Sequence, residues 1–127
     1  MRIRFGSDRG SAVVDFVLVG PLLIAVALAM VQVALALHVR TTLTAAAAEG
    51  ARAAAMAGSS VQIGEQRSRA VLAGNLAEST IESVEVGTLL DSGIGYTEVT
   101  IRARLPLIGL LGPSMMSVRG RAIQEHA

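Results

Sequence analysis

The sequence predicts an α+β fold: a long N-terminal helix able to cross a membrane continues into a small domain with a second helix and about three antiparallel strands. Three observations predict this fold. An uncharged apolar run near the N-terminus has the length of a membrane-spanning helix, an alanine-rich stretch follows it, and the C-terminal part alternates apolar with polar residues. The 127 residues are enough for one such domain.

The apolar run extends from Phe16 to Leu37 and contains no charged residue. A helix needs about 20 predominantly apolar residues to cross a bilayer. We therefore expect a transmembrane helix over residues 11–37. Residues 1–10 then form a short segment on one side of the membrane, and residues 38–127 form the domain on the other side.

The distribution of arginine predicts how this helix is oriented. Arg2, Arg4 and Arg9 precede the apolar run, whereas only Arg40 follows it closely. Basic residues flanking a membrane helix are enriched on the cytoplasmic side. The N-terminus is therefore expected in the cytoplasm and the domain in the extracytoplasmic space, which makes this a single-pass protein of the cell membrane.

Composition argues against several classes of function. The chain has no cysteine, which excludes disulfides and thiolate chemistry, and its net charge of +1 gives no indication of nucleic-acid binding. Its two histidines, His38 and His126, have no neighbours that suggest a general base or a metal ligand. We expect no enzymatic activity, no metal and no cofactor.

Two simpler interpretations of the N-terminal region compete. Ala34-Leu35-Ala36 has the form of a signal peptidase site, and cleavage after Ala36 would release a secreted domain. The apolar run is longer than the roughly 7–15 residues of a signal-peptide core, however. The second interpretation is an uncleaved anchor that binds a membrane partner. Neither interpretation accounts for an acidic residue, Asp15, at the start of the helix.

Asp15 follows Gly10 by five residues and directly precedes Phe16. An ionised carboxylate near the hydrocarbon region is costly unless it is paired or can reach water. In a purely structural account, Asp15 lies at headgroup depth and interacts favourably with the positive end of the helix dipole. A functional interpretation has to identify a positively charged group that pairs with the carboxylate of Asp15.

The string Gly10-Ser11-Ala12-Val13-Val14-Asp15-Phe16 resembles the processing site of type IV prepilins. The resemblance implies that a prepilin peptidase cleaves between Gly10 and Ser11 and leaves the helix in the membrane. It also implies that Asp15, with Phe16 beside it, takes part in assembly by pairing with the N-terminal amine of a neighbouring subunit. The family more often carries glutamate at this position, so Asp15 is one methylene shorter.

The chain is most similar to TadE-like minor pseudopilins of the tight-adherence (Tad/Flp) pilus. The similarity includes the alanine-rich residues 42–55, with Glu49-Gly50-Ala51-Arg52, and Leu105-Pro106-Leu107 near the C-terminus. It implies a role in assembling a pilus or a related secretion filament. The implied partners are other pilins or pseudopilins, the prepilin peptidase, the inner-membrane assembly platform and the lipid bilayer.

The alanine-rich residues 38–57 are expected to continue the membrane helix outward, because alanine has the highest helix propensity. Their small side chains suit packing against the chain's own sheet on one face and against a partner on the other. Glu49 and Arg52, three residues apart, are expected to pair on the helix surface.

A second helix is expected over residues 61–77. Gly58 ends the first helix, and Ser59 with Gln62 has the spacing of a capping box. The side expected to be buried consists of Val71, Leu72 and Leu76.

Strands are expected at residues 80–90, 98–105 and 117–123, with a turn at Asp91-Ser92-Gly93. In the central strand, Val99 and every second residue to Leu105 are expected to face the core. The connection to the last strand is unusually apolar for a loop. Its large residues, expected either to contact the membrane or a partner subunit or to cover the core, are Leu107, Ile108, Leu110 and Leu111.

Overall fold

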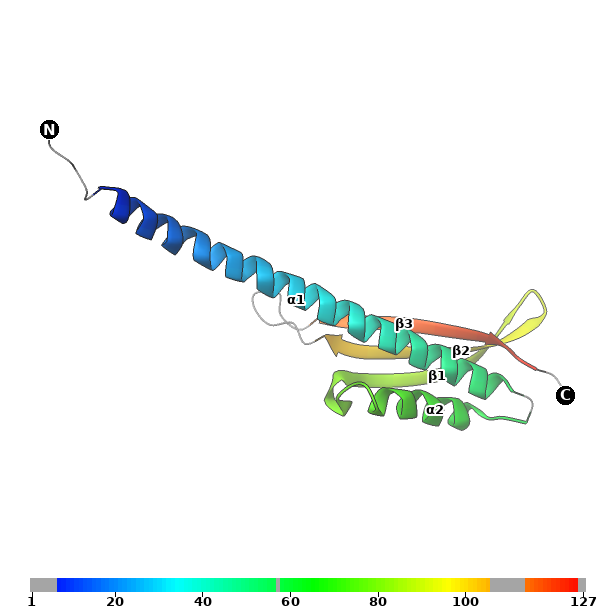
Figure 1. The fold of residues 1–127 in the computed structure, drawn as a ribbon. Coiled ribbons are helices and arrows are strands. Elements are labelled where there is room, and N and C mark those ends of the chain that lie inside the picture. The colour runs from blue at the N-terminus through cyan, green and yellow to red at the C-terminus, as the bar shows by residue number, and fades with distance from the viewer. Residues whose placement is uncertain (1–6, 57, 106–113, 126–127) are drawn as a thin grey trace, which may run out of the picture. The chain divides into compact units, whose positions relative to one another are not determined.

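The computed structural model describes residues 7–56, 58–105 and 114–125. In chain order the elements are helix α1 (Ser7–Ala55), helix α2 (Val61–Ala73), the 3₁₀ helix η1 (Glu78–Thr80), and strands β1 (Ile81–Asp91), β2 (Ile94–Leu105) and β3 (Ser114–Ile123) (Figure 1). The predicted α+β class, the long first helix, the second helix and the three strands are confirmed.

The chain divides into two compact units, Met1–Ala34 and Leu35–Ala127. Over its described residues the first unit consists of the N-terminal part of α1, whose apolar side chains are exposed; Phe16 is 78% exposed. Helix α1 continues through Pro21, and its C-terminal part belongs to the second unit. The second unit also contains α2 and the sheet.

The three strands form one antiparallel sheet in the order β1-β2-β3. A two-residue turn joins β1 to β2, and both of its residues have positive φ, 53° at Ser92 and 84° at Gly93. Positive φ at both central residues defines the type I′ turn, whose twist matches that of paired strands. The predicted turn at Asp91-Ser92-Gly93 is thus confirmed.

Strand β2 shows the predicted alternation. Val99, Ile101 and Ala103 are completely buried, whereas Arg102 and Arg104 are exposed. A central strand with one face on the core and the other in solvent requires this period of two. The inner face of the sheet is therefore the apolar one.

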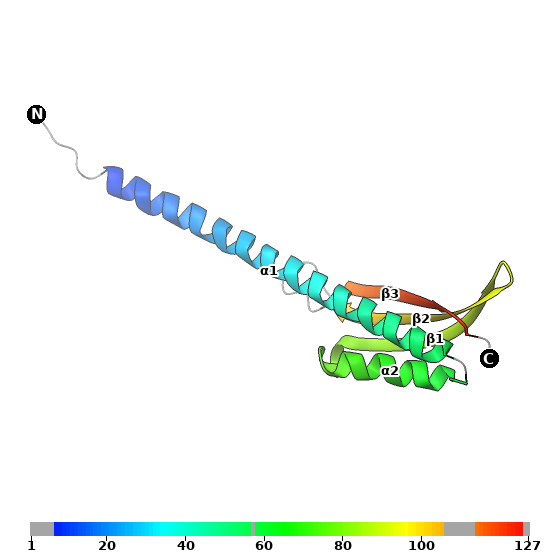
Figure 2. The same ribbon diagram turned by 45° about the vertical axis from the view of Figure 1, so that its right-hand side comes forward.

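The core lies between this inner face and the C-terminal part of α1, with α2 beside β1 (Figures 1 and 2). Most of the contribution from α1 is alanine, so the helix backbone comes close to the sheet. The core residues are Val39, Leu43, Ala46, Ala47, Ala51, Leu72, Val84, Val99, Ile101, Ala103 and Val118.

Two contacts hold β3 along α1. A methyl group added at Gly120 would lie 2.5 Å from the carbonyl carbon of Ala47, so the two backbones nearly touch there. Further along, the N–H of Glu125 donates a hydrogen bond of 2.9 Å to the carbonyl oxygen of Ala55. Only glycine fits the first position, because the neighbouring atoms belong to backbone.

Helices α1 and α2 also meet at small residues. A Cβ added at Gly50 would lie 2.8 Å from the Gly64 carbonyl oxygen, and one added at Gly64 would lie 2.6 Å from the Ala54 Cβ. The buried Ser68 hydroxyl donates a hydrogen bond of 3.1 Å to the Ala46 carbonyl oxygen. Gly50 and Gly64 thus allow the two helices to pack closely.

Replacing Ser68 with alanine is expected to lower the free energy of unfolding by about 1 kcal/mol, because one buried hydrogen bond is lost. Tyr96 is the only tyrosine, and the chain has no tryptophan, so its fluorescence reports on the folded sheet during chemical denaturation of the full chain in detergent. The exposed Ser117→Ala provides the control. Equal stability of the two variants would contradict the role of the Ser68 hydrogen bond.

The structure confirms that the second helix starts at Val61 and corrects its expected cap and its expected end. The N-cap of α2 is Ser60, which makes no side-chain capping bond, so the Ser59–Gln62 capping box is wrong. Helix α2 ends at Ala73 instead of residue 77, because the side chain of Asn75 donates to the Val71 carbonyl oxygen at 2.8 Å and caps the end. Leu72 is buried, whereas its neighbour Val71 is half-buried.

Strand β3 begins at Ser114, three residues earlier than expected, because the ladder with β2 continues to the pair of Leu105 and Ser114. The apolar residues between them, Leu107, Ile108, Leu110 and Leu111, lie outside the described residues.

Candidate membrane and assembly site

The residues predicted for processing and assembly lie together on the N-terminal part of α1. Gly10, Ser11, Asp15 and Phe16 are all helical and exposed. Ser11 and Asp15 are four residues apart, which is about 6 Å along the axis and nearly one turn. Both side chains therefore lie on the same side of the helix.

The carboxylate of Asp15 makes no hydrogen bond or ion pair with any of the described residues. It is followed by a long uncharged run, so a hydrocarbon environment would begin within a turn of it. A carboxylate in that position is stable only with water or a positive charge nearby. The described part of the chain supplies no such charge, which leaves the carboxylate available to an external one.

Gly10 has no packing role in the described part of the fold. A Cβ added there would have nothing within 4 Å, in contrast to Gly50 and Gly120. Glycine inside a helix costs roughly 0.5–1 kcal/mol relative to alanine. Packing against the described residues therefore does not explain the glycine at residue 10.

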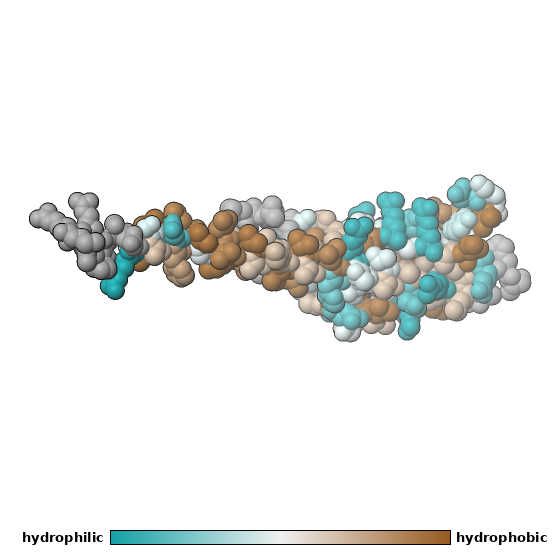
Figure 3. Space-filling model, turned by 45° about the horizontal axis from the view of Figure 1, so that its top comes forward, coloured by the Kyte–Doolittle hydropathy of each residue, from teal (hydrophilic) through white to brown (hydrophobic). Residues whose placement is uncertain are grey.

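The part of α1 that follows Asp15, from Phe16 to Leu37, has an apolar surface on every side. Among the described residues, α1 is the one helix that is long and apolar enough to cross a membrane. Figure 3 shows hydrophobic side chains covering this part of α1. A helix without a polar stripe needs an apolar surrounding, such as a bilayer or other helices. The finding is consistent with single-pass anchoring in a membrane.

The outer face of the sheet, in contrast, is charged. Arg121 pairs with Glu98 at 2.6 Å, and Arg104 pairs with Glu82 at 3.1 Å. Arg119 has no carboxylate within 4.0 Å among the described residues. The Arg104–Glu82 pair is exposed on both sides and contributes little to stability, whereas the Glu98 side chain is only 17% exposed. This face is therefore a solvated surface.

The predicted pair of Glu49 and Arg52 is confirmed at 3.3 Å, and Arg67 of α2 approaches the same carboxylate at 3.9 Å. These side chains are solvated and lie on the α1 and α2 surfaces. They connect the two helices at the exposed side of their crossing.

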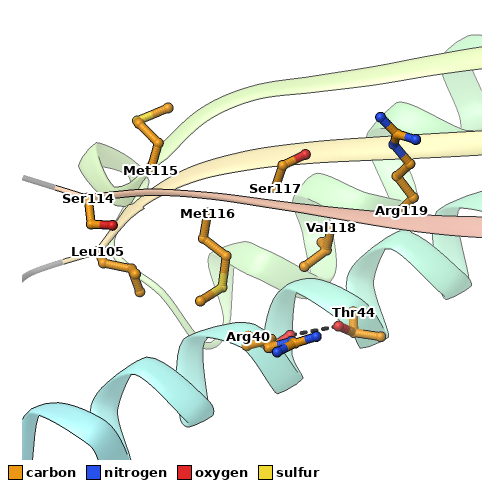
Figure 4. Close-up of a pocket in the computed structure, with 9 residues that line it drawn as sticks. All are labelled: Arg40, Thr44, Leu105, Ser114, Met115, Met116, Ser117, Val118 and Arg119. Carbon is orange, nitrogen blue, oxygen red and sulfur yellow. Dashed lines mark hydrogen bonds between the residues drawn. The ribbon is translucent and has the colours of Figure 1, made fainter.

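A hollow lies between α1 and β3. Figure 4 shows its walls, with Arg40 and Thr44 on the helix side and Leu105, Met116 and Val118 on the strand side. The Thr44 hydroxyl donates a hydrogen bond of 2.8 Å to the Arg40 carbonyl oxygen. No histidine or carboxylate is among its described lining residues. Across the described residues, no three His, Cys, Asp or Glu side chains gather into a metal site.

Sequence reasoning missed the contact between Gly50 and Gly64. The available signal was the spacing of small residues four apart, which is Ala46, Gly50 and Ala54 on α1 and Gly64 and Ser68 on α2. This spacing places small side chains on one face of each helix and allows close packing.

Fold and surface together define a class: a small α+β protein whose first helix is suited to anchor it in a membrane. Within that class, the family described as TadE-like protein has a model that matches residues 10–52, and the chain is TadE-like over this segment. The resemblance predicted from the sequence is thereby confirmed. This match supports a membrane protein associated with the tight-adherence pilus. No curated protein and no solved structure matches the chain.

Proposed function

We propose that the protein is a minor pseudopilin that acts in assembling a tight-adherence pilus or a related secretion filament, after a prepilin peptidase cleaves it between Gly10 and Ser11. The observation that carries the proposal is the exposed carboxylate of Asp15, which has no partner among the described residues and stands one turn after Ser11. The family match begins at Gly10, the residue after which the cut would occur.

Cleavage would create a positive charge that can pair with the carboxylate of Asp15. It converts the amide nitrogen of Ser11 into an ammonium group at the new helix N-terminus and exposes the first N–H groups of the helix. Two opposite charges in a medium of low dielectric stabilise each other strongly, but each is costly alone. The amine of one subunit and the carboxylate of its neighbour would therefore align two apolar helices side by side.

In this proposal the protein waits in the cell membrane, with its N-terminus in the cytoplasm and its domain outside. Its partners are other pilins or pseudopilins, the peptidase and the inner-membrane assembly platform. The apolar helix makes it a component that the platform extracts from the bilayer. The role is one of binding and assembly, without catalysis.

The N-terminus of the mature protein is the direct test. Intact mass of the membrane-fraction protein is expected to show a chain that begins at Ser11. A variant with Gly10→Leu is expected to keep its full leader, whereas Gly20→Leu, also at a glycine with nothing near an added Cβ, is expected to be processed normally.

Other starts would contradict the proposal in one of two ways. A start at Leu37, with recovery from the medium without detergent, would indicate a secreted domain cut after Ala36. A start at Met1 or Arg2 would indicate an uncleaved anchor that binds a membrane partner.

A further inference from the structure

The two contacts between β3 and α1 show how far the sheet extends along the helix. From Gly120 to Glu125 the extended chain advances about 16 Å, at about 3.3 Å per residue. The matching helix positions, Ala47 and Ala55, are about 12 Å apart at about 1.5 Å per residue. Each ångström of extended chain in this segment therefore corresponds to about three quarters of an ångström along the axis of α1.

The same ratio locates the beginning of β3. Ser114 precedes Gly120 by six residues, which is about 20 Å of strand and about 15 Å along the helix. Ten helix residues before Ala47 is Leu37, the last residue of the apolar run. Ser114 therefore lies near the level of Leu37. The hollow that Ser114 and Leu105 share with Arg40, three residues beyond Leu37, agrees with this level (Figure 4).

The side chains at this end of the sheet suit a membrane surface. Met115 is 53% exposed, and Leu105 and Met116 are partly buried against the core. Arg104 is balanced by Glu82 at 3.1 Å. Arg40 is exposed and has no carboxylate within 4.0 Å among the described residues. Met115 projects from the outer face of β3 and Arg40 from α1, so an exposed apolar side chain and an unbalanced guanidinium lie at the same end of the domain (Figure 4), as the mixed character of a lipid headgroup layer requires.

We propose that this end of the sheet, made of Leu105 and residues 114–116, rests in the headgroup layer of the bilayer that holds residues 16–37, with the Arg40 guanidinium on a lipid phosphate. The inference rests on the membrane insertion included in the proposed function, and it adds a second contact with the bilayer. The domain then contacts the bilayer through its sheet end as well as through the helix.

The full chain in vesicles of phosphatidylcholine and phosphatidylglycerol tests this contact. Because the sequence contains no cysteine, Ser114→Cys and Thr88→Cys each give a single labelling site for a fluorophore. Thr88 lies toward the opposite end of the sheet, where it pairs with Thr97. A nitroxide on the lipid headgroup is expected to quench the label at residue 114 severalfold more strongly than the label at residue 88.

A second pair of variants tests the phosphate contact. Arg40→Gln is expected to reduce quenching at residue 114, whereas Arg52→Gln, at an exposed arginine on the same helix, is expected to leave it unchanged. Quenching is measured only on protein that resists alkaline extraction. Equal quenching at residues 114 and 88, or no effect of Arg40→Gln, would overturn this inference alone. Failure of the chain to insert would overturn the membrane anchoring on which both proposals rest.

Discussion

Replacing Asp15 with alanine is expected to reduce pilus output at least about tenfold, because the amine of the neighbouring subunit is left without its counter-charge. Removing one member of a buried ion pair typically costs about 3–5 kcal/mol. The variant is expected to insert in the membrane as well as the wild type, since the apolar run is unchanged. Pilus output is measured as sheared filament protein per cell, and insertion as resistance to alkaline extraction.

Two further variants show whether the charge or only the side chain is needed. Asp15→Glu keeps the carboxylate and is expected to assemble, since glutamate adds a single methylene. Glu85→Ala removes another exposed carboxylate, on β1, and is expected to leave output unchanged. Normal pilus output from a processed Asp15→Ala protein would refute the assembly role of Asp15.

Replacing Gly120 with alanine is expected to lower the free energy of unfolding by about 3 kcal/mol, at the upper end of typical overpacking effects. The added Cβ would lie 2.5 Å from the carbonyl carbon and 2.6 Å from the carbonyl oxygen of Ala47. Both atoms are helix backbone, so no side-chain rotation relieves the overlap. The measurement is denaturation of the full chain in detergent, followed by Tyr96 fluorescence.

Gly87→Ala is the matched control for this variant, because Gly87 also lies in the sheet but has nothing within 4 Å of an added Cβ. Its stability is expected to change by no more than about 0.5 kcal/mol, as for most surface substitutions. A Gly120→Ala protein as stable as Gly87→Ala would show that α1 moves away from the sheet at little cost.

Features that depend on local pattern were predictable from the sequence. The alternation from Val99 to Leu105 indicated which face of β2 is buried, because the period of a strand is two. Asp91-Ser92-Gly93 indicated the turn, because aspartate, serine and glycine tolerate its backbone angles. The apolar run identified the first helix by length alone. In each of these cases neighbouring residues contain the whole signal.

Features that depend on distant contacts were not predictable in the same way. Ser60, not Ser59, is the N-cap of α2, and Asn75 caps its end earlier than the helical pattern indicated. The close approach of Gly50 to Gly64 depends on how two helices cross, which a single sequence does not specify. For the candidate site, the sequence identified Gly10, Ser11 and Asp15 from spacing. That all three are exposed, and that Asp15 is unpaired among the described residues, required the structure.

The contact between Gly120 and Ala47 joins residues far apart in the chain, and this has a consequence for export. Suppose that the N-terminal helix is anchored first and the rest of the chain then crosses the membrane. In that case β3 is the last of the three strands to reach the outside. Until then, the buried residues Val99 and Ile101 on β2 lack the strand that completes their sheet. Such long-range pairing forms late and slowly. If the domain lies outside the membrane as proposed, a chain that has not yet paired β3 with β2 would be more sensitive to extracytoplasmic proteases than the complete fold.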